Sequence, residues 1–94
     1  MLYLRICFDR EDAGPDRERL RAEHRAYLTS SPDAAIVQAG PMCRSDADDT
    51  NIGSFLIIEA ADEGAAQRFH DGDPFTKAGL YATSYVHRWD KHIG

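Results

Sequence analysis

Apolar residues along the chain follow two periodicities, which divide it into four strand-like and two helix-like segments. Residues 2–8, 35–40, 54–60 and 83–89 alternate or run continuously in strand-forming residues, as β-strands do. The segments between the first two and the last two of these carry helical spacing instead. The order strand–helix–strand–strand–helix–strand predicts an α+β, ferredoxin-like βαββαβ fold with an antiparallel sheet.

Turn-forming and capping residues place the two helices. Gly14-Pro15-Asp16 precedes a helix that runs to about Ser30, and Asp62 can cap a second helix that stops near Gly72. The apolar stripe of the first helix is spaced i, i+4, i+7 and i+8 and consists of Leu20, His24, Tyr27 and Leu28.

Two features interrupt the region between the second and third strands. Gly40-Pro41 is expected to end the second strand. The polar residues 45–51, with three aspartates, are expected to form a loop or hairpin connection to the third.

The third strand is apolar on both faces, unlike a strand that has one face in water. Phe55 and Ile57 lie on one side, and Leu56 and Ile58 lie on the other. Two helices cover only one face of a sheet, so the second face would stay exposed in a monomer. We therefore expect a homodimer in which two sheets pack face to face.

Composition limits the classes of function. The 94 residues fit one small domain, residues 1–94. A formal net charge of −5 argues against nucleic-acid binding, which needs clustered Lys and Arg. No apolar run could span a bilayer, and with no signal peptide visible we expect a cytoplasmic protein. The cysteine and histidine spacings give no metal-ligand pattern, and neither a metal nor a cofactor is expected.

The segment that begins at Asp73 combines a carboxylate, a rigid turn and an apolar anchor. Asp73 is expected at a helix N-cap, with Pro74 in the first helical position and Phe75 in the core. A carboxylate held in this way needs a polar partner. His24 is the best candidate, because it occupies an apolar helix position where a histidine needs a reason to be.

Several motifs resemble those of one family along essentially the whole chain. They are Arg21-x-x-His24-x-x-Tyr27-Leu28, Ala39-Gly40-Pro41-Met42, Gly53-Ser54-x-Leu56-Ile57-Ile58-Glu59-Ala60, Asp73-Pro74-Phe75-x-Lys77-Ala78-Gly79-Leu80 and Trp89. The chain thus resembles YciI-like (YCII-related domain) proteins of the dimeric α/β-barrel superfamily. The resemblance implies a ferredoxin-like protomer that pairs face to face as a dimeric α/β barrel. It also implies an active site around His24 and Asp73. The family that the chain resembles includes a member with dehydrochlorinase activity.

Each candidate site residue also has a structural explanation. His24 could be a core histidine bonded to a backbone carbonyl, and Asp73 could serve only as a cap. If the two meet, the carboxylate fixes the imidazole tautomer and makes the other nitrogen a general base or acid. The further candidates for substrate binding are Arg21, Gly40, Pro41 and Ser54, although a surface arginine and a strand-ending turn would explain most of them.

The leading hypothesis is a small cofactor-free enzyme that uses His24 and Asp73 for proton transfer on a small organic substrate. Elimination, isomerisation or lyase chemistry would suit one acid–base pair. The alternative is a non-catalytic domain that binds a small ligand in the same pocket. A third possibility is an oxygen-using monooxygenase of the same superfamily, which is compatible with the absence of an obvious cofactor motif.

Overall fold

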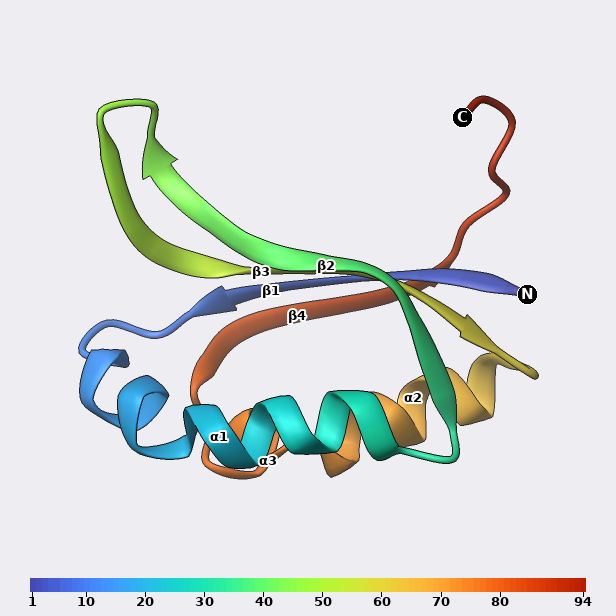
Figure 1. Cartoon of the computed structure of the whole chain (residues 1–94), viewed down its shortest axis with the longest axis horizontal. Helices are drawn as coiled ribbons and strands as arrows, with labels where there is room; N and C mark the ends of the chain where they lie inside the picture. Colours follow the sequence, from blue (N-terminus) through green and yellow to red (C-terminus); the bar gives the residue numbers. More distant parts are fainter.

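In the computed structural model, which describes all 94 residues, one antiparallel sheet carries all of its helices on one face (Figure 1). The strands lie in the order β2-β3-β1-β4. None of the helices is both long and apolar enough to cross a membrane. The strand order and the helices on one face of the sheet confirm the ferredoxin-like prediction. The elements are β1 (Leu2–Asp9), α1 (Gly14–Ser30), β2 (Ala34–Ser45), β3 (Asp48–Ala60), α2 (Glu63–Gly72), α3 (Pro74–Lys77) and β4 (Tyr81–Arg88).

The prediction that Gly40-Pro41 ends the second strand is wrong. Strand β2 continues through Pro41, which pairs with Ser54, and reaches Ser45. The reason is that β2 is an edge strand, where a residue without an N–H is tolerated because one side of the strand has no neighbour. Strand β3 begins at Asp48, so the connection is a tight turn at the tip of a long hairpin (Figure 1).

The main core fills the space between the sheet and the helices. Tyr3 of β1 and two residues of β3, Leu56 and Ile58, pack there against Ala66 and Phe69 of α2. A smaller cluster around Phe75 and Leu80 closes the end of the molecule where α3 lies.

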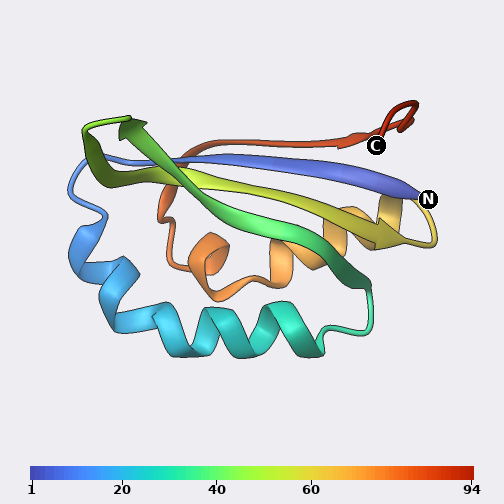
Figure 2. The ribbon, with the colours of Figure 1, turned by 45° about the horizontal axis from the view of Figure 1, so that its top comes forward.

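The opposite face of the sheet has no helix over it (Figure 2). Strand register places Ile6 between Phe55 of β3 and Tyr85 of β4, so apolar side chains run across three strands. Phe55 and Tyr85 are 37% and 49% exposed. This face of the sheet, which we call the open face, is the surface expected to pair in a homodimer, and that pairing stays a prediction.

The covered face of β1 contains one residue that breaks the apolar pattern. Tyr3, Arg5 and Cys7 all point toward the helices and are all buried. Arg5 places a guanidinium group on the central strand β1, with none of its side chain exposed. A charge in this position requires a partner, and that partner lies in the candidate site.

Candidate functional site

Asp73 is held at the junction of two helices. It ends α2 and caps α3, where its Oδ1 accepts a hydrogen bond of 2.9 Å from the backbone N–H of Phe75. Pro74 follows in the first turn of α3, and Phe75 is buried. The predicted cap is therefore confirmed, and it holds a carboxylate that is 0% exposed inside the fold.

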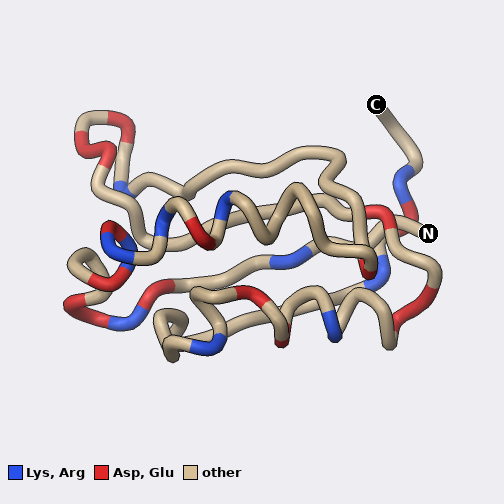
Figure 3. The backbone as a smooth tube through the Cα atoms, turned by 60° about the horizontal axis from the view of Figure 1, so that its bottom comes forward, with Lys and Arg blue, Asp and Glu red and all other residues tan.

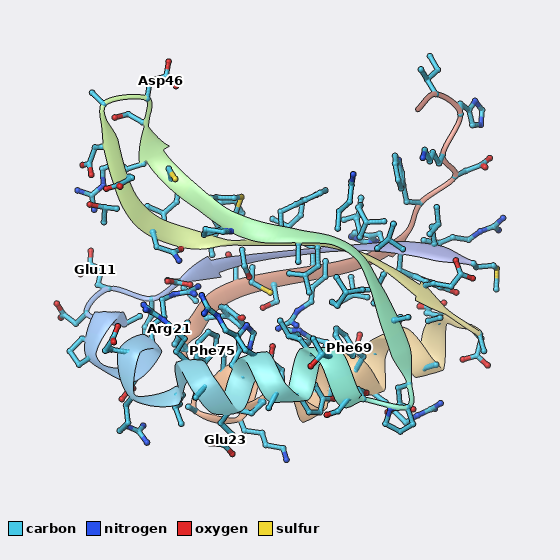
Figure 4. The ribbon with its side chains drawn as sticks, viewed as in Figure 1. Glu11, Arg21, Glu23, Asp46, Phe69 and Phe75 are labelled. Atoms are coloured by element: carbon cyan, nitrogen blue, oxygen red, sulfur yellow. The ribbon has the colours of Figure 1, made fainter.

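His24 reaches the same carboxylate from α1. Its Nδ1 lies 2.7 Å from Asp73 Oδ1, so the contact predicted from the sequence is present. Because an ionised carboxylate only accepts hydrogen bonds, Nδ1 carries the proton and its N–H donates the hydrogen bond to Asp73. The imidazole also stacks on the Phe75 ring, with centroids 3.8 Å apart and planes 9° apart. Figure 4 shows Phe75 in the space between α1 and the sheet. Two contacts thus fix both the orientation and the tautomer of the ring.

Arg5 approaches Asp73 from the sheet. Its Nη2 lies 2.8 Å from Asp73 Oδ2 and 3.4 Å from the Thr76 hydroxyl, and both charged side chains are completely buried. The guanidinium also lies over the Tyr81 ring, 5.3 Å from its centroid. Arg5 was not among the site residues predicted from the sequence, although a lone charge between Tyr3 and Cys7 on an apolar strand was a usable signal.

These contacts determine the charge on Asp73. Burial disfavours the anion, but the hydrogen bond from His24, the charge of Arg5 and the Phe75 N–H outweigh it and hold the pKa of Asp73 below its ordinary value. Burial also disfavours the charge on Arg5, yet its surroundings, Asp73 included, raise the pKa of its guanidinium. Asp73 and Arg5 therefore form a stable buried ion pair that His24 joins.

A cavity of about 470 Å³ opens beside His24, between α1 and the β2–β3 hairpin. The Nε2 of His24 has no hydrogen-bond partner in the protein, and the residue forms part of the cavity wall. Asp73 does not line the cavity and lies behind the histidine. The lining residues are Arg17, Arg21, His24, Arg25, Leu28, Ala39, Gly40, Pro41, Asn51, Ser54, Leu56 and Phe75.

Three arginines spaced four residues apart on α1 line one side of the cavity. Figure 3 shows that basic and acidic residues are interspersed along the backbone. Arg17 is neutralised by Asp9, which accepts two hydrogen bonds of 2.8 and 2.9 Å from its guanidinium. Arg21 pairs with Glu18 at 2.9 Å on the surface. Arg25 makes no ion pair, so its charge is available to a bound anion.

The structure brings the other sequence-predicted residues to this cavity. Arg21, Gly40, Pro41 and Ser54 all line it together with His24. Ser54 is buried, and its hydroxyl has no hydrogen-bond partner. Their roles in substrate binding stay predictions, as does the catalytic role of His24 and Asp73.

Comparison with known proteins finds relatives that span nearly the whole chain. The profile of the YCII-related domain family matches residues 1–90. The chain is 35% identical over 86 residues to Protein YciI of Escherichia coli O6:H1, a match that covers 86% of this chain and 88% of that protein. Protein YciI of Shigella flexneri matches to the same extent.

Solved structures give the same fold. One is 5-chloro-2-hydroxyhydroquinone dehydrochlorinase (TftG) from Burkholderia phenoliruptrix AC1100 in complex with 2,5-dihydroxybenzoquinone. Its TM-score is 0.82 at 38% identity, over 98% of this chain and 96% of that one. At3g17210 from Arabidopsis thaliana, with a TM-score of 0.55 at 10% identity over 99% of this chain and 96% of that one, is similar in fold alone.

Proposed function

The chain belongs to the YCII-related domain family, and from that premise we propose that it is a small cofactor-free enzyme using His24 and Asp73 for acid–base catalysis. One observation carries the proposal. His24 donates through Nδ1 to Asp73 at 2.7 Å, while the residue itself forms part of the wall of a cavity. A histidine that served only the core would have no need of both a buried carboxylate and an open space.

The geometry supports proton transfer at one atom. With its proton on Nδ1, the neutral imidazole has a lone pair on Nε2 that can accept a proton from a substrate in the cavity. The ionised Asp73 stabilises the imidazolium that forms, and stacking on Phe75 keeps the ring in plane. His24 can then return the proton as a general acid, and such catalysis contributes about two to four powers of ten in rate.

We infer that the substrate is a small hydroxylated ring that loses hydrogen chloride. The dehydrochlorinase relative supports this class of reaction, and a cavity of about 470 Å³ has room for one substituted ring. His24 would take a hydroxyl proton and return it to the chlorine-bearing carbon, which gives a keto tautomer. A second deprotonation would then expel chloride, so that the net loss is one HCl.

The cavity wall suits an anionic intermediate of this kind. Arg25 is unpaired and Arg21 is held only by a surface glutamate, so either can bind a phenolate oxygen. Gly40 and Pro41 shape the wall on the β2 side, and Ser54 adds a buried polar residue to the wall on the β3 side.

The test is chloride release from chlorinated hydroxyhydroquinones by purified protein. We expect wild type to release chloride and His24→Gln to be slower by about two to four powers of ten. His92→Gln, which changes a histidine in the exposed C-terminal segment, is the matched control and should retain the wild-type rate. Full turnover by His24→Gln would overturn the proposal, while ring binding without turnover by wild type would favour the ligand-binding alternative.

We also propose that two copies pair through the open face as a homodimer. Phe55 and Tyr85 expose apolar surface there that no element of the chain covers. Phe55→Asp would place a charge in the interface, so sedimentation should show a monomer. Gln67→Asp on the exposed side of α2 should leave the dimer intact, and a monomeric wild type at micromolar concentration would contradict the pairing.

A further inference from the structure

We propose that Arg5 is a positioning residue for His24: by pairing with Asp73, it makes the buried group of three side chains electrically neutral when the imidazole is unprotonated at Nε2. His24 is then a free base in the resting protein. The inference deepens the proposed function of His24 and rests on it, but it concerns a residue from the opposite side of the carboxylate.

The geometry divides the two carboxylate oxygens between two partners. Asp73 Oδ1 receives the His24 Nδ1–H at 2.7 Å and the Phe75 N–H at 2.9 Å. Asp73 Oδ2 faces the Arg5 Nη2 at 2.8 Å. Neither Arg5 nor Asp73 has any exposed side-chain surface, so water does not screen this ion pair.

The charge count explains what Arg5 does. With Arg5 present, an unprotonated His24 leaves one positive and one negative charge in contact, which sum to zero. Without Arg5, an unprotonated His24 would leave a lone carboxylate buried at high cost in free energy. The protein would lower that cost by keeping His24 as imidazolium, and an imidazolium cannot accept a substrate proton.

Other ionisable groups near Asp73 do not replace Arg5. Arg17 of α1 is already neutralised by Asp9. His70 of α2 is neutral, because burial, and after it the charge of Arg5, lower its pKa. Tyr81 of β4 is neutral, because burial raises its pKa far above the ordinary value. On the cavity side of His24, Arg21 and Arg25 are exposed to water, which screens their charges.

The hydrogen bonding of Arg5 argues against a purely structural role. Its Nε and Nη1 are buried without a partner, and only Nη2 contacts an acceptor. Buried donors in native proteins are nearly always paired, so an arginine selected for stability would be a poor solution here. An apolar side chain at residue 5 would leave no donor unpaired, but it would leave the Asp73 carboxylate buried without a counter-ion.

The test is the protonation state of His24, read from imidazole nitrogen-15 shifts during a pH titration. In wild type at pH 7.5, we expect the neutral tautomer with its proton on Nδ1. In Arg5→Met, the titration midpoint of His24 should rise by about one pH unit or more, because a neighbouring cation is removed. Arg5→Lys keeps the charge and should stay near wild type, as should Arg68→Met, which alters a surface arginine on α2.

Turnover adds a second readout. The pH–rate profile of Arg5→Met should shift to higher pH by the same interval as the His24 midpoint. Its rate should return toward the wild-type rate at alkaline pH, which would not happen if the variant had lost its structure. An unchanged His24 midpoint in Arg5→Met would overturn the inference. If Arg5→Met does not fold, wild type still decides, because an imidazolium at pH 7.5 would overturn it as well. If His24→Gln keeps full turnover while the midpoint shift occurs, the proposed function fails and the charge role of Arg5 stands.

Discussion

The two sides of the buried Arg5–Asp73 pair contain the same residue type with different consequences. On the α1 side, His24 binds the carboxylate and lines the cavity. On the α2 side, His70 packs beside the Tyr81 ring, 6.4 Å between centroids, and its buried Nδ1 has no partner. Both histidines are 8% exposed, so burial does not distinguish them. A buried histidine becomes a candidate base when a carboxylate holds one nitrogen and a cavity receives the other.

Packing explains why the α1 side can hold a site. Tyr27 of α1 donates to the Phe69 carbonyl at 2.9 Å, which joins α1 to α2 one turn after His24. A Cβ at residue 72 would collide with the Tyr27 hydroxyl, so Gly72 permits this close approach just before Asp73. Because these contacts fix the helix junction, they also fix the distance between His24 and Asp73.

The largest expected effect on turnover and stability comes from a substitution of Asp73. Asp73→Asn should reduce chloride release by about two to four powers of ten, because it removes the negative charge that stabilises the imidazolium of His24. It should also lower the free energy of unfolding by about 3–5 kcal/mol, because Arg5 would be left buried without its counter-ion. Urea denaturation at pH 7 and steady-state assays measure the two effects.

Acid provides the control for Asp73. Its pKa in the folded protein lies below the ordinary value of 3.8, so its contribution to stability is present above pH 3.8 and is lost as the pH falls below that value. The difference in unfolding free energy between wild type and Asp73→Asn should therefore shrink in strong acid. A difference that stays constant down to pH 2 would contradict the ion pair.

A smaller effect is expected for substrate binding by the α1 side of the cavity. Arg25→Gln removes the unpaired cation of the cavity wall and should raise KM for a phenolate-bearing substrate about tenfold, with kcat within about twofold. Arg19, on the same helix, is exposed and pairs with Asp16, so Arg19→Gln is the matched control. Equal KM values for the two variants would remove Arg25 from the site.

The smallest effect tests the α2 side. His70→Gln should leave chloride release within about threefold, because His70 donates nothing to Asp73. Burial lowers the pKa of His70 below 6.5, so the unfolded chain takes up that proton first, and wild-type stability falls as the pH drops through about 6.5. Glutamine cannot titrate, so the stability of His70→Gln should depend less on pH between 7.5 and 5 in urea titrations. Loss of turnover in this variant would erase the contrast between the two histidines.

The sequence predicted those parts of the site whose cause is local. Asp73 before Pro74 is a capping signal, and the helix spacing placed His24 on the buried face. Arg5 and the course of β2 depend on the sheet as a whole. Nothing local shows that β2 is an edge strand and tolerates Pro41, or that Arg5 lies opposite a carboxylate from another element 68 residues away in the sequence.

The proposed catalysis requires that His24 accept the substrate proton at Nε2. We would measure kcat/KM against pH in wild type and, on the same protein, the nitrogen-15 titration of His24. Chloride release should rise with pH to a plateau, and its midpoint should coincide with the deprotonation of His24. A rate that stays constant across the His24 titration, or that follows a different ionisation, would contradict the role of His24 as the catalytic base.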